Sequence, residues 1–278
     1  MNLTAASLFK FIKKRINTSY PNARCAAGAD PESIDFSHPS GRMNATEHGL
    51  FVEERIMYRP CPLCLTPEPV FFYRGPQRNY LRCRKCGLIY VPRDELLAPE
   101  EEKARYDLHE NDASDPGYRK FLQQLTRPLL ARIEPPPQFG LDFGSGPGPV
   151  LAQMLEARGY PMTCYDPYYA PNTDALDKTY DFVTCSEVVE HFNQPAREWR
   201  LLLNLLKPGG WLGIMTTLVN DLDQFPEMHY ITDATHVSFY SRQTFDYLAS
   251  QRAVDVTYQG DKIILIHKPG HQQETNPS

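Results

Sequence analysis

The segment that most restricts the fold of this chain is Phe139–Val150, where an apolar stretch gives way to closely spaced glycines. Its sequence is Phe-Gly-Leu-Asp-Phe-Gly-Ser-Gly-Pro-Gly-Pro-Val. Apolar residues at helical spacing continue to Leu155, and Gly159 ends that run. A buried strand, a glycine turn and a helix N-terminus in this order predict a nucleotide-binding corner, because glycines let the backbone approach a ligand closely.

Three further segments follow in a fixed order: Cys164–Asp166, Tyr180–Phe192 and Leu206–Ile214. Together with the Asp-x-Gly-x-Gly-x-Gly run, they resemble the motifs of class I S-adenosylmethionine-dependent methyltransferases. The resemblance covers about half of the chain. The alternative is a dehydrogenase-type Rossmann domain, whose fingerprint is Gly-x-Gly-x-x-Gly and therefore differs in spacing.

The resemblance implies an α/β, Rossmann-like seven-stranded methyltransferase sheet that binds S-adenosylmethionine. The residues that it assigns to the cofactor are Asp142, Gly144, Ser145, Gly146, Gly148, Asp166 and Glu187. One segment departs from the family pattern, because Tyr180 follows Asp166 by only fourteen positions. That length is short for a helix and a third strand, so the residue that contacts adenine has no clear counterpart.

Titratable side chains follow the expected fourth and fifth strands, where this fold presents the methyl group. His191 follows the fourth strand, and the segment 221–240 follows the fifth. We expect His236 to be a general base, oriented by Asp233, with His191 as a second candidate. The alternative is that Asp233 makes a turn and that both histidines support the structure.

Four of the seven cysteines form two Cys-x-x-Cys pairs, Cys61/Cys64 and Cys83/Cys86. The intervening residues suit a hairpin, which would bring four sulfurs into a tetrahedron, so a closed structural Zn²⁺ site is predicted. The segment resembles a zinc ribbon. Disulfides or a redox pair are the alternatives. This cysteine usage favours a reducing compartment, and we expect a cytoplasmic protein.

Basic and aromatic residues alternate around these cysteines, although the whole chain has a net charge of −5. The acidic balance favours a small-molecule methyl acceptor. The alternative enzyme is an RNA methyltransferase that binds RNA through its basic ribbon, since arginines and aromatic rings can bind an RNA strand. A third hypothesis is a non-catalytic interaction module that binds the cofactor without turnover.

The expected organisation is a leader over 1–56, a zinc ribbon over 57–93 and a helical lid or linker over 94–134. The methyltransferase domain then spans 135–268, and 269–278 form a tail. The leader and the tail are expected to be disordered. Tyr106, His109 and Tyr118 are candidates to cover the cofactor. No apolar run is long enough for an integral membrane segment.

Overall fold

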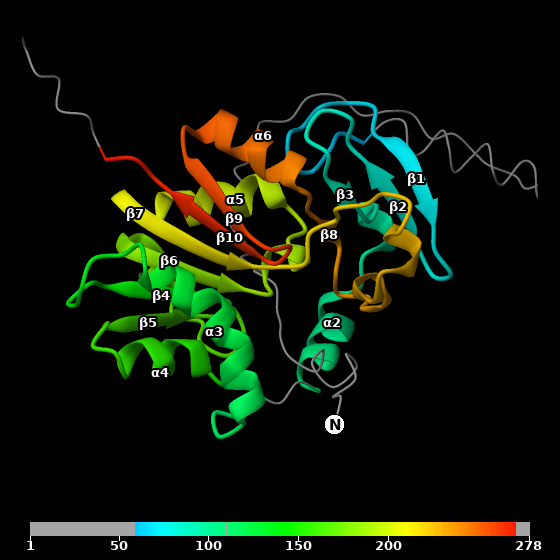
Figure 1. Ribbon diagram of the computed structural model, residues 1–278. Helices are drawn as coiled ribbons and strands as arrows, with labels where there is room; N and C mark the ends of the chain where they lie inside the picture. Colours follow the sequence, from blue (N-terminus) through cyan, green and yellow to red (C-terminus); the bar gives the residue numbers. More distant parts are fainter. Residues whose placement is uncertain (1–58, 109–110, 271–278) are drawn as a thin grey trace, which may run out of the picture.

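The computed structural model describes residues 59–108 and 111–270, so the expected leader, His109 and most of the expected tail lie outside the described residues. Two sheets organise the described chain, a six-stranded sheet and a smaller four-stranded one (Figure 1). None of the helices in these residues is long and apolar enough to cross a membrane.

The larger sheet has the strand order β5-β4-β6-β7-β10-β9. Its strands are β4 (Gly140–Phe143), β5 (Met162–Tyr165), β6 (Tyr180–Ser186), β7 (Leu206–Met215), β9 (Asp255–Gln259) and β10 (Ile263–His267). The first four strands in the spatial order pair in parallel, while β10 pairs antiparallel with both β7 and β9. This is the predicted α/β sheet, and β10 and β9 form an antiparallel pair at one edge of it.

The predicted count of seven strands is wrong for the residues that the structure describes, since the larger sheet has six. After β5 the chain turns back on itself through a bridge between Asp166 and Ala170. A short 3-10 helix, η3 (Thr173–Asp177), then leads into β6. A third strand is absent because the prolines Pro167 and Pro171 lack amide donors and the remaining segment is too short for a crossover.

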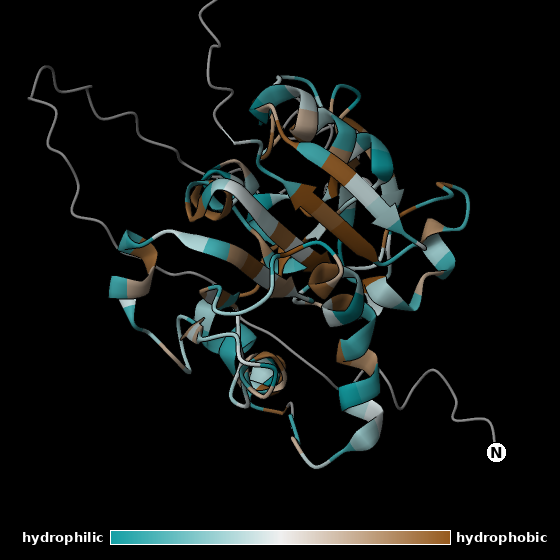
Figure 2. Ribbon diagram, turned by 60° about the vertical axis from the view of Figure 1, so that its left-hand side comes forward, coloured by the Kyte–Doolittle hydropathy of each residue, from teal (hydrophilic) through white to brown (hydrophobic). Residues whose placement is uncertain are grey.

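Helices cover both faces of the larger sheet. They are α3 (Pro116–Leu130) and α4 (Val150–Glu156) on one face, and α5 (Pro195–Asn204) and α6 (Arg242–Arg252) on the other. Strand alternation explains the two cores: Ile263 and Leu265 of β10 pack with α3, whereas Ile264 and Ile266 pack with α5 and α6. Figure 2 shows hydrophobic colouring on the inner strands and hydrophilic colouring on many of the surrounding helices and loops.

The helix starts follow the expected capping chemistry. The Asp115 carboxylate accepts a hydrogen bond from the Gly117 amide at the start of α3, and Pro116 occupies the first turn. Ser241 caps α6 through the Thr244 amide. The remaining helix in the predicted lid or linker, α2 (Pro99–Tyr106), begins at Pro99 with three acidic residues in its first turn.

The smaller sheet contains the predicted hairpin, β1 (Val70–Arg74) and β2 (Asn79–Arg82), and continues into β3 (Ile89–Tyr90). Its fourth strand, β8 (Ser238–Phe239), comes from the segment after β7 and pairs antiparallel with β3. The cysteine-bearing ribbon is therefore joined to the segment 221–240, which carries the candidate base His236, a link that the sequence did not predict (Figure 1).

Aromatic packing strengthens this join. Phe225 is fully buried and lies 5.1 Å from Tyr80 and 5.3 Å from Phe239, measured between ring centroids. Tyr230 and Val237 belong to the same core cluster. Each buried aromatic ring contributes about 1.5–3 kcal/mol by removing apolar surface from water, so the ribbon and the segment 221–240 form one packed unit.

Candidate functional site

The predicted glycine corner lies between β4 and α4, at the carboxyl edge of the parallel strands. Gly144 and Gly146 have φ values of +76° and +66°, which L side chains rarely adopt. A Cβ on Gly144 would meet Val188 at 2.5 Å. The corner therefore needs glycine for its backbone conformation and for its close contact with the loop after β6.

Two predicted acidic residues flank this corner and are almost fully buried. Asp166 accepts hydrogen bonds from the amides of Gly146, Tyr168 and Tyr169 at 2.9 to 3.0 Å. Asp142 accepts a 2.8 Å hydrogen bond from the Thr184 hydroxyl. Asp166 thus fixes the glycine turn against the end of β5, a bracing role that sequence reasoning did not foresee.

A residue that sequence reasoning missed, Asn111, lies directly over the glycines. Its backbone carbonyl oxygen is 2.6 Å from the position of a Cβ on Gly148, and its side-chain Nδ2 is 3.0 Å from that of a Cβ on Gly146. Both polar atoms of the Asn111 side chain are buried without a hydrogen-bond partner. Such atoms are costly to bury, so this corner presents polar groups that suit a polar ligand.

The free space at the corner is small, about 10 Å³. It is lined by Tyr118, Leu122, Asp142, Gly144, Ser145, Gly148, Val150, Leu151 and Ser186. Burial raises the pKa of Tyr118 well above its usual range, so its hydroxyl stays protonated at neutral pH. Of the three expected lid residues, Tyr118 lies at the corner.

The loop after β6 carries a strained residue, Glu187, with a φ of +51°. Its amide donates a 2.6 Å hydrogen bond to the Met215 carbonyl at the end of β7. A left-handed conformation costs a non-glycine residue about 1–2 kcal/mol, and such strain is typical of functional positions. Glu187 is 9% exposed, and its neighbour Val188 contacts Gly144 of the glycine corner.

His191 ends the short helix η4 (Val189–His191) and is buried in a hydrogen-bonded chain. Its Nδ1 lies 3.0 Å from the Thr235 carbonyl and 3.0 Å from the Tyr106 hydroxyl. A carbonyl only accepts, so Nδ1 carries the proton and donates it. The Tyr106 hydroxyl in turn donates a 2.9 Å hydrogen bond to the buried Glu102. The predicted lid residue Tyr106 therefore lies in the histidine network.

His236 lies beside His191, with the two ring centroids 4.8 Å apart. Its Nδ1 donates a 2.7 Å hydrogen bond to the Tyr230 carbonyl, which leaves the lone pair on Nε2. Asp233 was expected to orient this ring, but the Tyr230 carbonyl makes that contact. The Asp233 carboxylate lies 3.8 Å from Nε2 instead.

Asp233 has an environment that favours its ionised form. Burial acts against ionisation, but the positive charge that His236 and His191 can carry and the hydrogen bonds from Thr235 outweigh it, so the pKa of Asp233 is lowered. The arrangement places a carboxylate beside two imidazoles at the carboxyl edge of β6 and β7. Such a group can accept, hold or release a proton.

The four cysteines of the ribbon come together as predicted. Cys61 and Cys86 have their sulfurs 3.6 Å apart, and Cys64 and Cys83 have theirs 3.4 Å apart. All four sulfurs lie within 4.8 Å of one another. The donor set and its compactness fit tetrahedral Zn²⁺, and no disulfide joins them in the structure. A hydrogen bond from Cys86 lowers the pKa of Cys61 to about 6, which favours a thiolate there.

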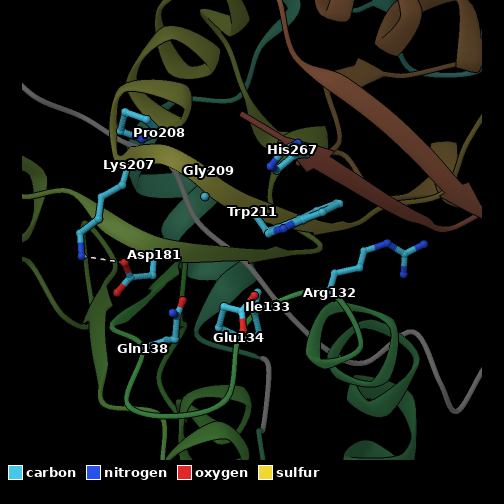
Figure 3. Close-up of a pocket in the computed structure, with 11 residues that line it drawn as sticks. Arg132, Ile133, Glu134, Gln138, Asp181, Lys207, Pro208, Gly209, Trp211 and His267 are labelled. Carbon is cyan, nitrogen blue, oxygen red and sulfur yellow. Dashed lines mark hydrogen bonds and ion pairs between the residues drawn. The ribbon is translucent and has the colours of Figure 1, made fainter. Parts of the chain in front are cut away.

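A larger cavity, of about 330 Å³, lies at the opposite edge of the sheet (Figure 3). Lys207 and Asp181 form a 2.7 Å ion pair on its wall, and the rings of Trp211 and His267 lie 4.6 Å apart. Lys207 and Trp211 belong to the amino-terminal part of β7, Asp181 to the start of β6 and His267 to the end of β10. The cavity is therefore separate from the glycine corner and from His191 and His236.

The comparison with protein families agrees with this fold and site. Residues 117–257, just over half of the chain, match the sequence model of a family described as a methyltransferase domain. The chain belongs to this methyltransferase family. The matched range contains β4 to β7, the glycines of the corner and the two candidate histidines, His191 and His236.

A curated relative is the ubiquinone biosynthesis O-methyltransferase of Photorhabdus laumondii, which is 32% identical over 71 residues. That match covers 26% of this chain and 30% of the relative.

Solved structures with a similar fold include an O-methyltransferase family protein from Burkholderia thailandensis, which has 17% identity and a TM-score of 0.43. The similarity covers 61% of this chain and 59% of that protein. The 1,6-didemethyltoxoflavin-N1-methyltransferase of the same organism, solved with S-adenosylhomocysteine, has 16% identity and a TM-score of 0.43. This similarity covers 73% of this chain and 99% of that N1-methyltransferase.

Proposed function

We propose that the protein binds S-adenosylmethionine at the glycine corner and transfers its methyl group to a hydroxyl of a small-molecule acceptor. The observation that carries this proposal is the corner itself. Two left-handed glycines, a buried aspartate braced on their turn and the unsatisfied side chain of Asn111 meet at the carboxyl edge of the sheet. Family membership supports the same assignment.

The residues proposed to hold the cofactor are Asp142, Gly144, Ser145, Gly146, Gly148, Asp166 and Glu187. Asp166 keeps one acceptor position, on Oδ2, for a ribose hydroxyl, because each carboxylate oxygen can accept two hydrogen bonds and Oδ1 already accepts two. The free space of about 10 Å³ is far too small for a nucleoside, so binding requires Tyr118 and Asn111 to move outward. When bound, the cofactor supplies an electrophilic methyl group on sulfur.

We propose that His236 accepts the proton of the acceptor. Its Nδ1 proton is committed to the Tyr230 carbonyl, so the Nε2 lone pair is available as a base. Asp233, 3.8 Å from Nε2, would stabilise the imidazolium that results. His191 is the second candidate, and its place in the chain from Glu102 through Tyr106 favours a positioning role.

A small-molecule acceptor is favoured over RNA by what the ribbon arginines contact. Arg78 donates hydrogen bonds to the carbonyls of Asp233 and Ala234. Arg59 pairs with Asp94, and Arg82 contacts Gln243. These guanidinium groups support neighbouring segments of the chain. The name of the Photorhabdus relative supports an oxygen nucleophile.

We further propose that Cys61, Cys64, Cys83 and Cys86 bind one structural Zn²⁺. Four thiolates fill a tetrahedral coordination sphere, so this ion would hold the ribbon together rather than take part in methyl transfer.

The deciding experiment follows S-adenosylhomocysteine formation with purified full-length protein and separate pools of hydroxylated small molecules and RNA. Turnover with a hydroxylated small molecule, lost on Gly146→Val, would support the proposal. Turnover with RNA alone would overturn the choice of acceptor. Cofactor binding without turnover in any pool would favour the non-catalytic module.

A further inference from the structure

We propose that Glu190, His191 and His236 form a binding site for a divalent transition-metal ion, separate from the four cysteines. One ligand atom from each of the three lies within 4.8 Å of the other two. Their exposed fractions are 0, 1 and 7%, so the cluster is shielded from bulk water. Two imidazoles and one carboxylate are a donor set that binds such ions in many proteins.

The hydrogen bonds of the two histidines point to metal ligation. Both rings donate Nδ1–H to a backbone carbonyl, of Thr235 for His191 and of Tyr230 for His236. These contacts fix each neutral imidazole in the tautomer whose lone pair is on Nε2. A histidine that ligates a metal through one nitrogen usually donates the other N–H to a carbonyl or carboxylate in this way.

The carboxylate of Glu190 is held on the same side as the two rings. One of its oxygens accepts a 3.1 Å hydrogen bond from Thr216, and the other lies 3.9 Å from His191 Nε2. Ligand atoms of a tetrahedral Zn²⁺ site are about 3.4 Å apart, given bonds of about 2.0–2.1 Å. A shift of about half an ångström would therefore bring this pair to coordination distance.

Two hydrogen bonds hold the two segments of the site in register without the ion. The Val237 amide donates a 2.8 Å hydrogen bond to the Glu190 carbonyl, and the Ser238 hydroxyl donates a 2.7 Å hydrogen bond to the Phe192 carbonyl. His236 precedes this junction and Glu190 lies within it. A largely prebuilt site loses little conformational entropy on binding, which favours affinity.

The donor set selects the class of ion. Imidazole nitrogen suits Zn²⁺, Co²⁺, Ni²⁺ and Fe²⁺, whereas Mg²⁺ and Ca²⁺ prefer oxygen ligands. Three protein ligands leave a further coordination position. If the proposed function holds, that position would take the acceptor hydroxyl, and the ion would lower the pKa of this hydroxyl in place of a free His236.

The test compares the zinc content of full-length protein and two variants after equilibration with Zn²⁺ and removal of unbound metal. Glu190→Gln removes a ligand with little change of shape. His236→Asn retains a side-chain N–H for the Tyr230 carbonyl but lacks the second ring nitrogen. The control is His229→Asn, because His229 is exposed in the same segment. The four cysteines are unchanged in all four proteins, so any difference reports on the proposed site.

We expect both variants to bind about one zinc equivalent less than the wild type and the control. Equal zinc content in folded variants, verified by circular dichroism, would overturn the proposal. A Co²⁺ titration of the wild type covers the case in which the variants do not fold. Weak d–d bands beyond those of a sulfur-ligated ion support the site, and their absence overturns it. No methyl transfer is measured, so a negative result would leave the proposed function standing.

Discussion

The guanidinium of Arg78, on the hairpin of the ribbon, donates a 2.7 Å hydrogen bond to the backbone carbonyl of Ala234. It makes two further hydrogen bonds, to the carbonyls of Asp233 at 2.8 Å and Ile231 at 3.3 Å. One arginine therefore holds three carbonyls of the segment that leads to His236. Through this contact the ribbon helps to fix the position of the loop that carries the candidate base, His236.

Arg78→Ala should lower the free energy of unfolding by about 2 kcal/mol, because hydrogen bonds from a charged group are lost and three partly buried carbonyls lose their donor. Urea denaturation followed by circular dichroism measures this change. Arg74→Ala is the matched control, since Arg74 is exposed on the same hairpin. Equal losses for the two variants would show that Arg78 has no special part in holding the loop.

Gly146→Ala should weaken the binding of S-adenosylmethionine at least tenfold, because a Cβ would enter the ligand side of the corner and strain a left-handed backbone. Isothermal titration calorimetry measures the affinity. Gly260→Ala controls for strain, because Gly260 also has a positive φ of 62° but has nothing within 4 Å of its Cβ position. Unchanged affinity of Gly146→Ala would remove the glycine corner from the cofactor site.

His236→Ala should slow methyl transfer by about a hundredfold or more while cofactor affinity barely changes, as expected when a general base is lost. Steady-state kinetics with the acceptor found in the pool screen provides the measurement. His229→Ala should retain the wild-type rate. Loss of cofactor binding in His236→Ala would instead make His236 a cofactor contact, and normal turnover would make it structural.

Removal of zinc from the four cysteines should loosen the segment 231–240 as well as the ribbon. The reason is that β3 pairs with β8 and that Arg78 holds the carbonyls before it. Hydrogen exchange before and after chelation should show faster exchange at Ser238 and Phe239 and little change at β4 and β6. Purified protein that contains no zinc would refute the metal assignment itself.

The parts of the fold that depend on neighbouring residues were predictable from the sequence. The spacing of Gly144, Gly146 and Gly148 predicts the glycine corner, and the two Cys-x-x-Cys pairs predict the hairpin between them. The start of α3 follows from Asp115 and Pro116. In each case the sequence signal and the structure lie within a few residues of one another.

The parts that were missed depend on residues far apart in the chain. Tyr106 and His191 are 85 positions apart, and neither belongs to a motif that points to the other. The Tyr230 carbonyl that fixes His236 is a backbone group, so its identity carries no signal in the sequence. The orphan side chain of Asn111 becomes informative only once the fold places it over Gly148.

Because β3 pairs with β8, the smaller sheet cannot be completed during synthesis until β8 has been made. The ribbon emerges early from the ribosome, but the partner of Ile89 is Phe239, about 150 positions later. At the usual translation rate of about 5–20 residues per second, the edge of β3 that pairs with β8 stays unpaired for many seconds. An open strand edge is a site for pairing with other chains, so the nascent protein is most exposed to aggregation over that interval.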